Sequence, residues 1–176
     1  YPFNPGELVI GARGTFFARA IDTQAKQLQD VCTHMAAHDG AAVVEVLQNC
    51  VIFNDGTHKE VTDKEVRDDR QLWLEHGKPM IFGKNRDKGI VLRGTRLEVV
   101  TIGENGITED DILVHDETTE NTGIHMMLAQ MRPPQFPMAF GVIRAYKQPT
   151  YNQLFEKKME EAQENTKIKC VDDLLN

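Results

Sequence analysis

The sequence has few cysteines and no pair of them in Cys-x-x-Cys spacing. Its three cysteines, Cys32, Cys50 and Cys170, are odd in number and widely separated. This excludes a disulfide framework and a four-cysteine metal site made by this chain alone. Such sparse use of cysteine is typical of a reducing cytoplasm, which is the expected location.

Long apolar runs and basic clusters are also missing. No run approaches the roughly 20 residues of a membrane span, and no signal peptide is recognisable, so no membrane association is expected. The 20 basic and 27 acidic residues give a net charge of −7, which argues against nucleic-acid binding. Walker and Gly-x-Ser-x-Gly motifs are absent. With 40% hydrophobic and 27% charged residues, the 176-residue chain still has the composition of one folded domain with at most a small appendage.

One stretch, Ala42 to Asn54, organises the first part of the chain. It opens with Ala-Val-Val-Glu-Val-Leu, an apolar run of strand length that is typical of a strand buried on both faces of a parallel sheet. Gln48-Asn49 ends the run, and Cys50 follows. Ligands gather beyond the carboxyl ends of strands in open α/β sheets, so Cys50 is the candidate functional residue. The alternative is a small buried side chain, since free cysteines are often core residues.

The segments before this stretch alternate between helix and strand. Asn4 suits an N-cap and Pro5 the first turn of a short helix. A strand is expected over 15–21 and a helix over 24–38, whose apolar periodicity predicts a core stripe that includes Cys32. This order predicts an α/β fold with a parallel sheet, completed by strands from elsewhere in the protein.

The rest of the sequence predicts shorter elements. A helix is expected from Thr62 or Asp63 through residues 72–74, ending before Gly77-Lys78-Pro79. Strands are expected over 79–83 and 88–92 as a hairpin, and then over 97–102 and 112–116. A helix from about 119 ends at Arg132-Pro133-Pro134. A strand over 139–144 and a polar helix over 152–165 follow, and the tail that contains Cys170 either docks on a partner or frays.

Other candidate residues have structural explanations. His34 and His38 share a helix face and are spaced to chelate a metal, but no third ligand is visible. His115-Asp116-Glu117 follows a predicted strand and is either a catalytic group or a polar strand exit that caps the next helix. The acidic run around Asp63 predicts a solvated surface.

Several motifs together resemble one enzyme family. They are Phe3-Asn4-Pro5, the strand Gly14 to Ala20, the stretch Val44 to Asn54, Gly89-Ile90-Val91, Leu97 to Val100, Leu113 to Glu117, Ala139 to Val142 and Pro149-Thr150-Tyr151. Each is similar to a segment of the beta subunit of 2-oxoacid:ferredoxin oxidoreductases, particularly the 2-oxoglutarate type. The resemblance extends to about Tyr151, and its most specific part is the Cys50 stretch.

The resemblance implies an activity, cofactors and partners. Members of this family oxidatively decarboxylate a 2-oxoacid onto coenzyme A and pass electrons to ferredoxin, and the beta subunit works with an alpha subunit. The family's beta subunit binds thiamine diphosphate and magnesium through a Gly-Asp-Gly…Asn segment. It also carries a 4Fe-4S cluster on four cysteines, three of them near its N-terminus. Neither Gly-Asp-Gly nor Cys-x-x-Cys occurs here, so the chain resembles the C-terminal part of the subunit, with the thiamine site expected upstream of Tyr1.

The resemblance also places Cys50 at the fourth cluster ligand. Many members have proline before this cysteine, whereas here it is Asn49, which predicts either a looser backbone or a hydrogen bond from Asn49 to the cluster. The implied fold is α/β. It comprises the C-terminal half of a thiamine-diphosphate-binding parallel-sheet domain over 1–58, a mixed α+β region over 59–151, and a polar helix and tail over 152–176.

Two alternatives remain from the sequence. Overall likeness favours 2-oxoglutarate as the substrate, with pyruvate or a branched-chain 2-oxoacid as the alternative. A part of the beta subunit without the thiamine segment is not expected to be catalytically complete. The alternative from a different functional class is a protein-interaction module: a redox-silent α/β domain in which Cys50 is a core residue. An upstream Cys-x-x-Cys and Gly-Asp-Gly would decide between the two classes.

Overall fold

The computed structural model describes residues 3–166 and residue 173. The chain divides into two compact units, Tyr1–Tyr146 and Lys147–Asn176, each described here by itself. Cys170 and its neighbours in the predicted docking tail lie outside the described residues. Among the described residues, no helix is long and apolar enough to cross a membrane.

The first four elements confirm the predicted alternation of helix and strand. They are α1 (Pro5–Gly11), β1 (Phe16–Ile21), α2 (Ala25–Ala36) and β2 (Ala42–Leu47). The Asn4 side chain accepts a hydrogen bond from the Gly6 amide, as expected of an N-cap. β1 and β2 pair in parallel, in a register that runs from Phe16 opposite Ala42 to Ile21 opposite Leu47.

Strands from the second half of the chain complete this sheet, in the order β2-β1-β7-β3. β7 (Met138–Ala145) lies antiparallel to β1 and parallel to β3 (Gln71–Leu74). Gly141, with φ of +90°, lets β7 approach β3, because a Cβ there would lie 2.8 Å from the Leu74 carbonyl oxygen. The sheet is therefore mixed, and the predicted α/β class is confirmed.

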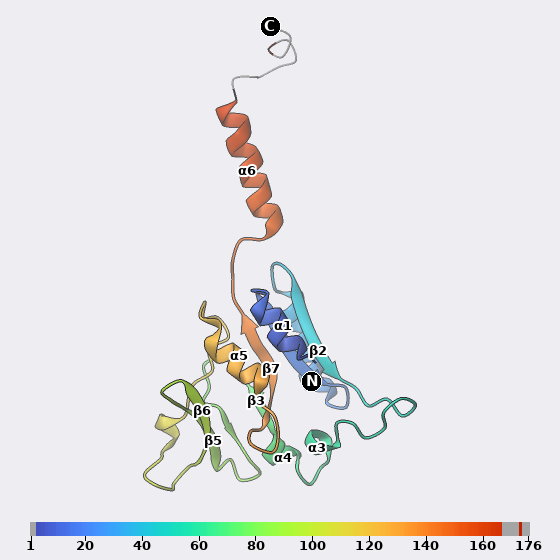
Figure 1. Cartoon of the computed structure of the whole chain (residues 1–176), viewed down its shortest axis with the longest axis vertical. Helices are drawn as coiled ribbons and strands as arrows, with labels where there is room; N and C mark the ends of the chain where they lie inside the picture. The colour runs from blue at the N-terminus through green and yellow to red at the C-terminus, as the bar shows by residue number, and fades with distance from the viewer. Residues whose placement is uncertain (1–2, 167–172, 174–176) are drawn as a thin grey trace. The chain divides into compact units, whose positions relative to one another are not determined.

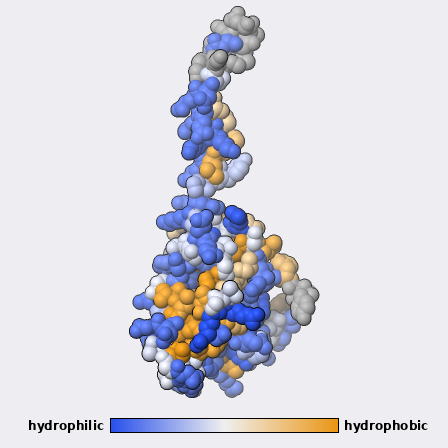
Figure 2. All heavy atoms as spheres, turned by 60° about the vertical axis from the view of Figure 1, so that its left-hand side comes forward, coloured by the Kyte–Doolittle hydropathy of each residue, from blue (hydrophilic) through white to orange (hydrophobic). Residues whose placement is uncertain are grey.

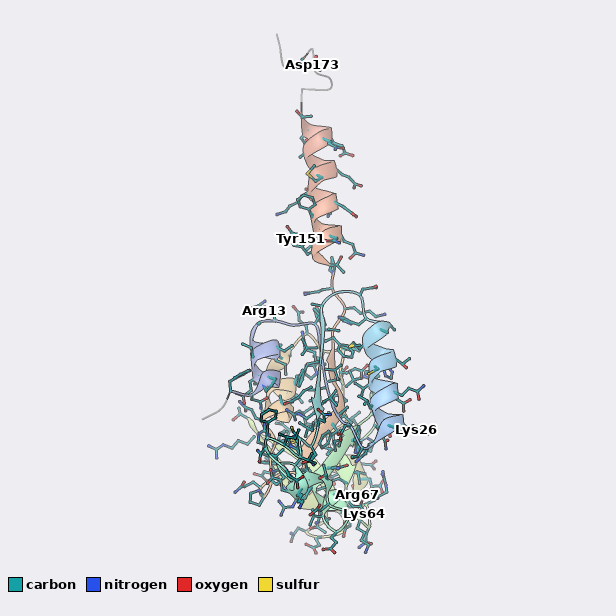
Figure 3. All side chains as sticks on the ribbon, turned by 90° about the vertical axis from the view of Figure 1, so that its right-hand side faces the viewer. Arg13, Lys26, Lys64, Arg67, Tyr151 and Asp173 are labelled. Atoms are coloured by element: carbon teal, nitrogen blue, oxygen red, sulfur yellow. The ribbon has the colours of Figure 1, made fainter. Side chains whose placement is uncertain are left out.

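Helices cover both faces of the sheet (Figure 3). On one face of the sheet, Phe17 belongs to the hydrophobic core that α1 and α5 (Thr122–Gln130) cover. On the other face, Phe16 and Ala18 pack with Val31 of α2. Successive residues of a strand point to opposite faces, so β1 contributes to both cores and all six of its residues are buried. α2 differs from the prediction, because Val31 is its buried residue and Cys32 is only half-buried.

The region between β3 and α5 forms a smaller antiparallel sheet in the order β4-β5-β6. Its strands are β4 (Ile81–Phe82), β5 (Lys88–Arg93) and β6 (Arg96–Thr101), which confirms the predicted hairpin and the strand after it. A single turn of 3₁₀ helix, η1 (Glu109–Asp111), precedes α5. Residues 112–116 were wrongly predicted as a strand. The Leu113 and His115 amides bond to Ile90 and Lys78, and Val114 makes only an isolated bridge to Pro79.

The helix predicted from Thr62 or Asp63 through residue 74 is also wrong. The chain forms two short helices, α3 (Lys59–Thr62) and α4 (Arg67–Arg70), and then enters β3. Leu72, Trp73 and Leu74 pair with Ala139, Phe140 and Gly141 of β7. Pairing with a distant strand therefore overrides the local helical pattern.

β2 was expected to be buried on both faces, which is wrong. It is an edge strand, and Val43 and Val46 are 40% and 42% exposed. Its attachment to β1 is reinforced by Arg19, whose Nε donates to Glu45 at 2.7 Å. The buried Arg19 guanidinium also donates to the Ala139 and Ala129 carbonyls, so one side chain links β1, β2, β7 and α5. The Arg19 hydrogen bonds therefore hold β2, and with it the start of the segment that contains Cys50, in a defined position beside β1.

The second unit contains α6 (Tyr151–Asn165), which confirms the predicted polar helix. Thr150 and Gln153 form a capping box at its start. Four apolar residues lie along one side of the helix (Figure 2), and all four are exposed: Tyr151, Leu154, Phe155 and Met159.

Candidate functional site

The candidate site is the loop that follows β2, residues 48–56. In Figure 1 this part of the chain extends away from the sheet before it returns at α3. Its first end is anchored, because buried Leu47 packs with Ile21, Val61 and Phe140, and the Leu47 carbonyl accepts from the Asp22 amide at 3.1 Å. The loop therefore starts from a rigid sheet corner.

Asn49 closes the loop across its base. Its side-chain amide donates to Asp55 Oδ1 at 2.9 Å, and its side-chain oxygen accepts from the Gly56 amide at 2.8 Å. Gly56 adopts φ of +76°, which favours glycine. The Asn49 side chain is thus hydrogen-bonded within the loop.

Cys50 lies inside this closed loop and is partly exposed. Its backbone forms an antiparallel bridge with Asn54, and its carbonyl accepts from the Asn54 amide at 2.9 Å. Hydrogen bonds from the backbone amides of Phe53, Ile52 and Asn54 lower the pKa of the Cys50 thiol. A lower pKa favours the thiolate, which is the form of cysteine that binds metals and attacks electrophiles.

Three apolar residues follow Cys50 at the tip of the loop. Val51, Ile52 and Phe53, called the apolar tip from here on, are 73%, 82% and 90% exposed. Single exposed apolar residues are ordinary, but a consecutive run of them marks a surface with a function. The sequence shows the run itself, whereas its exposure appears only in the structure.

Cys50 is the one thiol at this site. Cys32 lies on α2, and Cys170 is outside the described residues. In the described part of the chain, no group of three or more His, Cys, Asp or Glu side chains is placed to hold a metal ion.

The pair His34 and His38 does not form a site. The His34 ring hydrogen-bonds the Asp30 carbonyl at 2.9 Å, and His38 Nε2 lies 2.9 Å from the Thr15 hydroxyl. Both rings have local structural partners, so the chelating reading has no support from the geometry.

His115-Asp116-Glu117 joins a buried polar network, called the histidine brace from here on, made of His115, His125 and Arg144. His115 Nε2 bonds to the Val142 carbonyl at 2.8 Å, and His125 Nε2 to the Asp116 carbonyl at 2.8 Å. Arg144 donates to the Gly14 and Thr119 carbonyls and lies 3.1 Å from His125 Nδ1. The network ties the 115–119 segment to β7.

The electrostatics of the brace follow from its burial. Burial lowers the pKa of His115 to about 4 and also lowers that of His125, so both rings are neutral at pH 7. Hydrogen bonds from the Thr118 side chain and amide lower the pKa of Asp116, while burial raises that of Glu117. Glu117 lines a cavity of about 520 Å³ with His34, His76 and Trp73. This cavity was not predictable from the sequence, because its lining comes from four separate segments of the chain.

Comparisons with known proteins point to one class, the oxidoreductase subunits that act on 2-oxoacids. No family model matches the chain. The 2-oxoglutarate oxidoreductase subunit KorB of Mycobacterium tuberculosis is 36% identical over 153 residues, which is 86% of this chain and 40% of KorB. The 2-oxoacid:ferredoxin oxidoreductase subunit beta of Saccharolobus solfataricus is 38% identical over 63 residues, 36% of this chain and 21% of that subunit.

A solved structure agrees in fold. The 2-oxoglutarate:ferredoxin oxidoreductase from Magnetococcus marinus, with 2-oxoglutarate, coenzyme A and succinyl-CoA bound, matches with a TM-score of 0.56. The match covers 99% of this chain and 43% of that chain at 18% identity, so it speaks for the fold alone. The resemblance to beta subunits of 2-oxoacid:ferredoxin oxidoreductases is confirmed, and this chain spans about two fifths of KorB.

Proposed function

We propose that this chain is part of the beta subunit of a 2-oxoglutarate-type 2-oxoacid:ferredoxin oxidoreductase and that Cys50 is a ligand of its 4Fe-4S cluster. The whole enzyme converts a 2-oxoacid to its acyl-CoA and passes the electrons to ferredoxin. The observation that carries the proposal is the 36% identity to KorB over 86% of this chain, together with the place of Cys50, a partly exposed thiol in the loop just beyond the end of β2.

The donor set at Cys50 fits one corner of such a cluster. Cysteine thiolates hold 4Fe-4S clusters, and hydrogen bonds to their sulfurs tune the reduction potential. When bound, the cluster accepts and releases one electron at a time. The residues of this chain hold the thiolate: Leu47 fixes the start of the loop, Asn49 closes it, and the amides of residues 52–54 stabilise the sulfur's negative charge.

Thiamine diphosphate and magnesium have no proposed ligand in this chain. The sequence has no Gly-Asp-Gly segment, so these cofactors are assigned to the part of the subunit that the chain does not span. Residues 1–58 would then be the C-terminal half of the thiamine-binding domain, followed by the 59–151 region and the 152–176 helix and tail. The chain alone is not catalytically complete.

Substrate and partners follow from the relatives. Likeness to KorB over 86% of this chain favours 2-oxoglutarate over pyruvate or a branched-chain 2-oxoacid. The proposed partners are an alpha subunit, ferredoxin and coenzyme A. Low cysteine content supports a cytoplasmic location.

The test is an anaerobic iron and sulfide assay on the complete natural polypeptide. Native protein is compared with Cys50→Ser, and Cys32→Ser is the matched control because that thiol lies on α2. We expect Cys50→Ser to lose most of its cluster iron and Cys32→Ser to keep it. Full iron in Cys50→Ser would refute the ligand role. Absence of iron from native protein would favour the redox-silent interaction module instead.

A further inference from the structure

The cavity beside Glu117, called the Glu117 cavity from here on, lies between α2, the end of β3, β7 and the segment before α5. Its volume of about 520 Å³ falls within the range of roughly 300–1,000 Å³ that is typical of small-molecule pockets. Val31, Leu74 and Val142 form its apolar lining, and all three are buried members of the two cores that flank the sheet. The apolar part of the cavity is therefore held in shape by the folded core.

The formally charged side chains that line the Glu117 cavity are all acidic. Asp30 comes from α2, Glu75 directly follows β3, and Glu117 comes from the segment before α5. His34 and His76 also line the cavity, but no lysine or arginine does so among the described residues. With histidine counted as neutral, the lining carries negative charge alone. The cavity should therefore attract cations and repel anions, which include 2-oxoglutarate and coenzyme A.

Glu117 is the carboxylate that would gain most from a cation. It is half-buried, and in the described part of the chain its carboxylate has neither a hydrogen bond nor an ion pair. Burial raises the pKa of Glu117, and the nearby His76 and His34 offset this only in part. A partly buried charge without a partner is unfavourable, so a positive charge placed beside it is stabilised more than at an exposed carboxylate.

Trp73 places an aromatic ring beside these acidic groups. The ring borders the cavity and stacks on Phe140, with 5.2 Å between the ring centroids. Its Nε1 donates to Gln71 Oε1 at 2.9 Å, which fixes the orientation of the ring. Aromatic rings attract cations through their π electrons. A cation in the cavity would therefore meet both carboxylates and a positioned indole ring.

The lining suits an organic cation better than a metal ion. In the described residues, no three His, Cys, Asp or Glu side chains converge closely enough to hold a metal. The acidic groups instead surround a space with an apolar lining, and such a lining can bury a hydrocarbon body. A protonated amine carries both parts, a charged head and a hydrocarbon body.

We propose that the Glu117 cavity binds a small organic amine in its protonated form. The ammonium group lies beside Glu117 and the neighbouring carboxylates, and the hydrocarbon body lies on Val31, Leu74 and Val142. This binding site goes beyond the proposed function and uses no residue of the Cys50 loop.

The first experiment compares a charged and an uncharged probe of the same length on the complete natural polypeptide. The probes are n-hexylamine, which is protonated at neutral pH, and hexan-1-ol, and ligand-observed NMR titration measures both dissociation constants. We expect the amine to bind more tightly than the alcohol by roughly fivefold, the effect of one ion pair of moderate strength. Equal affinities of the two probes, or no binding of the amine, would overturn the proposal.

The second experiment places the amine in the cavity. Glu117→Gln keeps the shape of the side chain and removes its charge, and Asp30→Asn does the same on α2. The matched control is Glu109→Gln, at an exposed carboxylate on η1 outside the cavity.

We expect Glu117→Gln to weaken binding of the amine severalfold and to leave binding of hexan-1-ol unchanged. Asp30→Asn should have a smaller effect in the same direction, and it decides the matter if Glu117→Gln does not fold. The control should bind as native protein does. Native affinity in both cavity variants would refute the site. An equal loss in the control would refute it as well, because the amine would then respond only to the overall negative charge.

The outcome is separable from that of the proposed function. If Cys50→Ser keeps its iron, the ligand role of Cys50 falls and the amine site is unaffected. If the amine does not bind while Cys50→Ser loses its iron, the amine site alone is wrong.

Discussion

The Cys50 loop and the histidine brace both depart from the usual rule that apolar side chains are buried and polar ones exposed. The loop holds apolar residues in water, with Phe53 90% exposed, whereas the brace holds polar residues in the core, with His115, His125 and Arg144 at 1%, 0% and 3%. The brace finds most of its hydrogen-bond partners within the chain, although His115 Nδ1 is the one buried side-chain polar atom without a partner among the described residues. The apolar tip, by contrast, is left largely uncovered by the residues that the structure describes.

This contrast between the brace and the loop helps to tell residues that stabilise the fold from residues that serve a function. A buried polar group costs free energy unless it is hydrogen-bonded, so a largely hydrogen-bonded network such as the brace is explained by the segments of the fold that it joins. An exposed apolar run gains nothing from its own fold and implies a partner surface. The brace should therefore govern stability, and the loop should govern the chemistry of the sulfur.

The largest expected effect comes from removing the central cation of the brace. Arg144→Met removes the donor to the half-buried Gly14 and Thr119 carbonyls and the charged partner of the buried His125 ring. We expect the free energy of unfolding to fall by roughly 4 kcal/mol. Denaturant titration followed by circular dichroism measures it, and Arg96→Met, at an exposed arginine, should change it by less than about 0.5 kcal/mol. Equal effects of the two variants would show that the brace is not a stabilising element.

A pH effect of somewhat smaller size is expected from His115. Its folded pKa of about 4 lies below the ordinary 6.5, because burial outweighs the bond to Val142 and the nearby Asp116 carboxylate, with His125 and His76 also opposing protonation. The neutral ring therefore contributes stability that is complete above pH 6.5 and is lost as the pH falls toward 4.

The loss amounts to about 3 kcal/mol when fully developed. Melting temperatures measured at intervals from pH 7 to pH 4 should fall less steeply in His115→Phe than in native protein. A variant with the native pH dependence would show that other groups set the acid limit. Asn49→Ala, which changes the loop, should keep the native dependence.

The smallest change in stability is expected from a substitution in the Cys50 loop, which should also change the pKa of the Cys50 thiol. Asn49→Ala removes two hydrogen bonds at the loop base and should lower the free energy of unfolding by about 1 kcal/mol. Because the amides around the sulfur then lose their fixed placement, the pKa of Cys50 should rise toward its ordinary value. The alkylation rate of Cys50 against pH, in iron-free protein that also carries Cys32→Ser and Cys170→Ser, measures the shift. An unchanged pH profile would show that Asn49 does not position the amides.

The place of Cys50 in the fold was predicted from the sequence more completely than its surroundings were. The strand-length run before Cys50 placed the thiol at the end of β2, and the motif around it resembled a known ligand position. Its hydrogen-bond setting was not predictable, because it depends on how Asn49 bonds to Asp55 and Gly56 and on where the backbone of residues 52–54 then lies. Arg19 was missed for a related reason, since its partners on β2, α5 and β7 are up to 120 residues away in sequence.

The sequence by itself determined the local elements. Apolar periodicity predicted α2, and apolar runs predicted β1, β2 and β7. Caps at Asn4 and Thr150 mark the starts of α1 and of α6, which was predicted as a polar helix. These features depend on neighbouring residues and on the fixed repeats of helix and strand.

The tertiary structure decided which strands pair and which surfaces remain open. It turned residues 71–74 into a strand beside β7, inserted β7 between β1 and β3, and left β2 at the edge of the sheet. Pairing energy depends on residues far apart in the chain, so no local pattern specifies it. For the same reason, only the folded chain distinguishes the exposed apolar tip after Cys50 from an ordinary run of core residues.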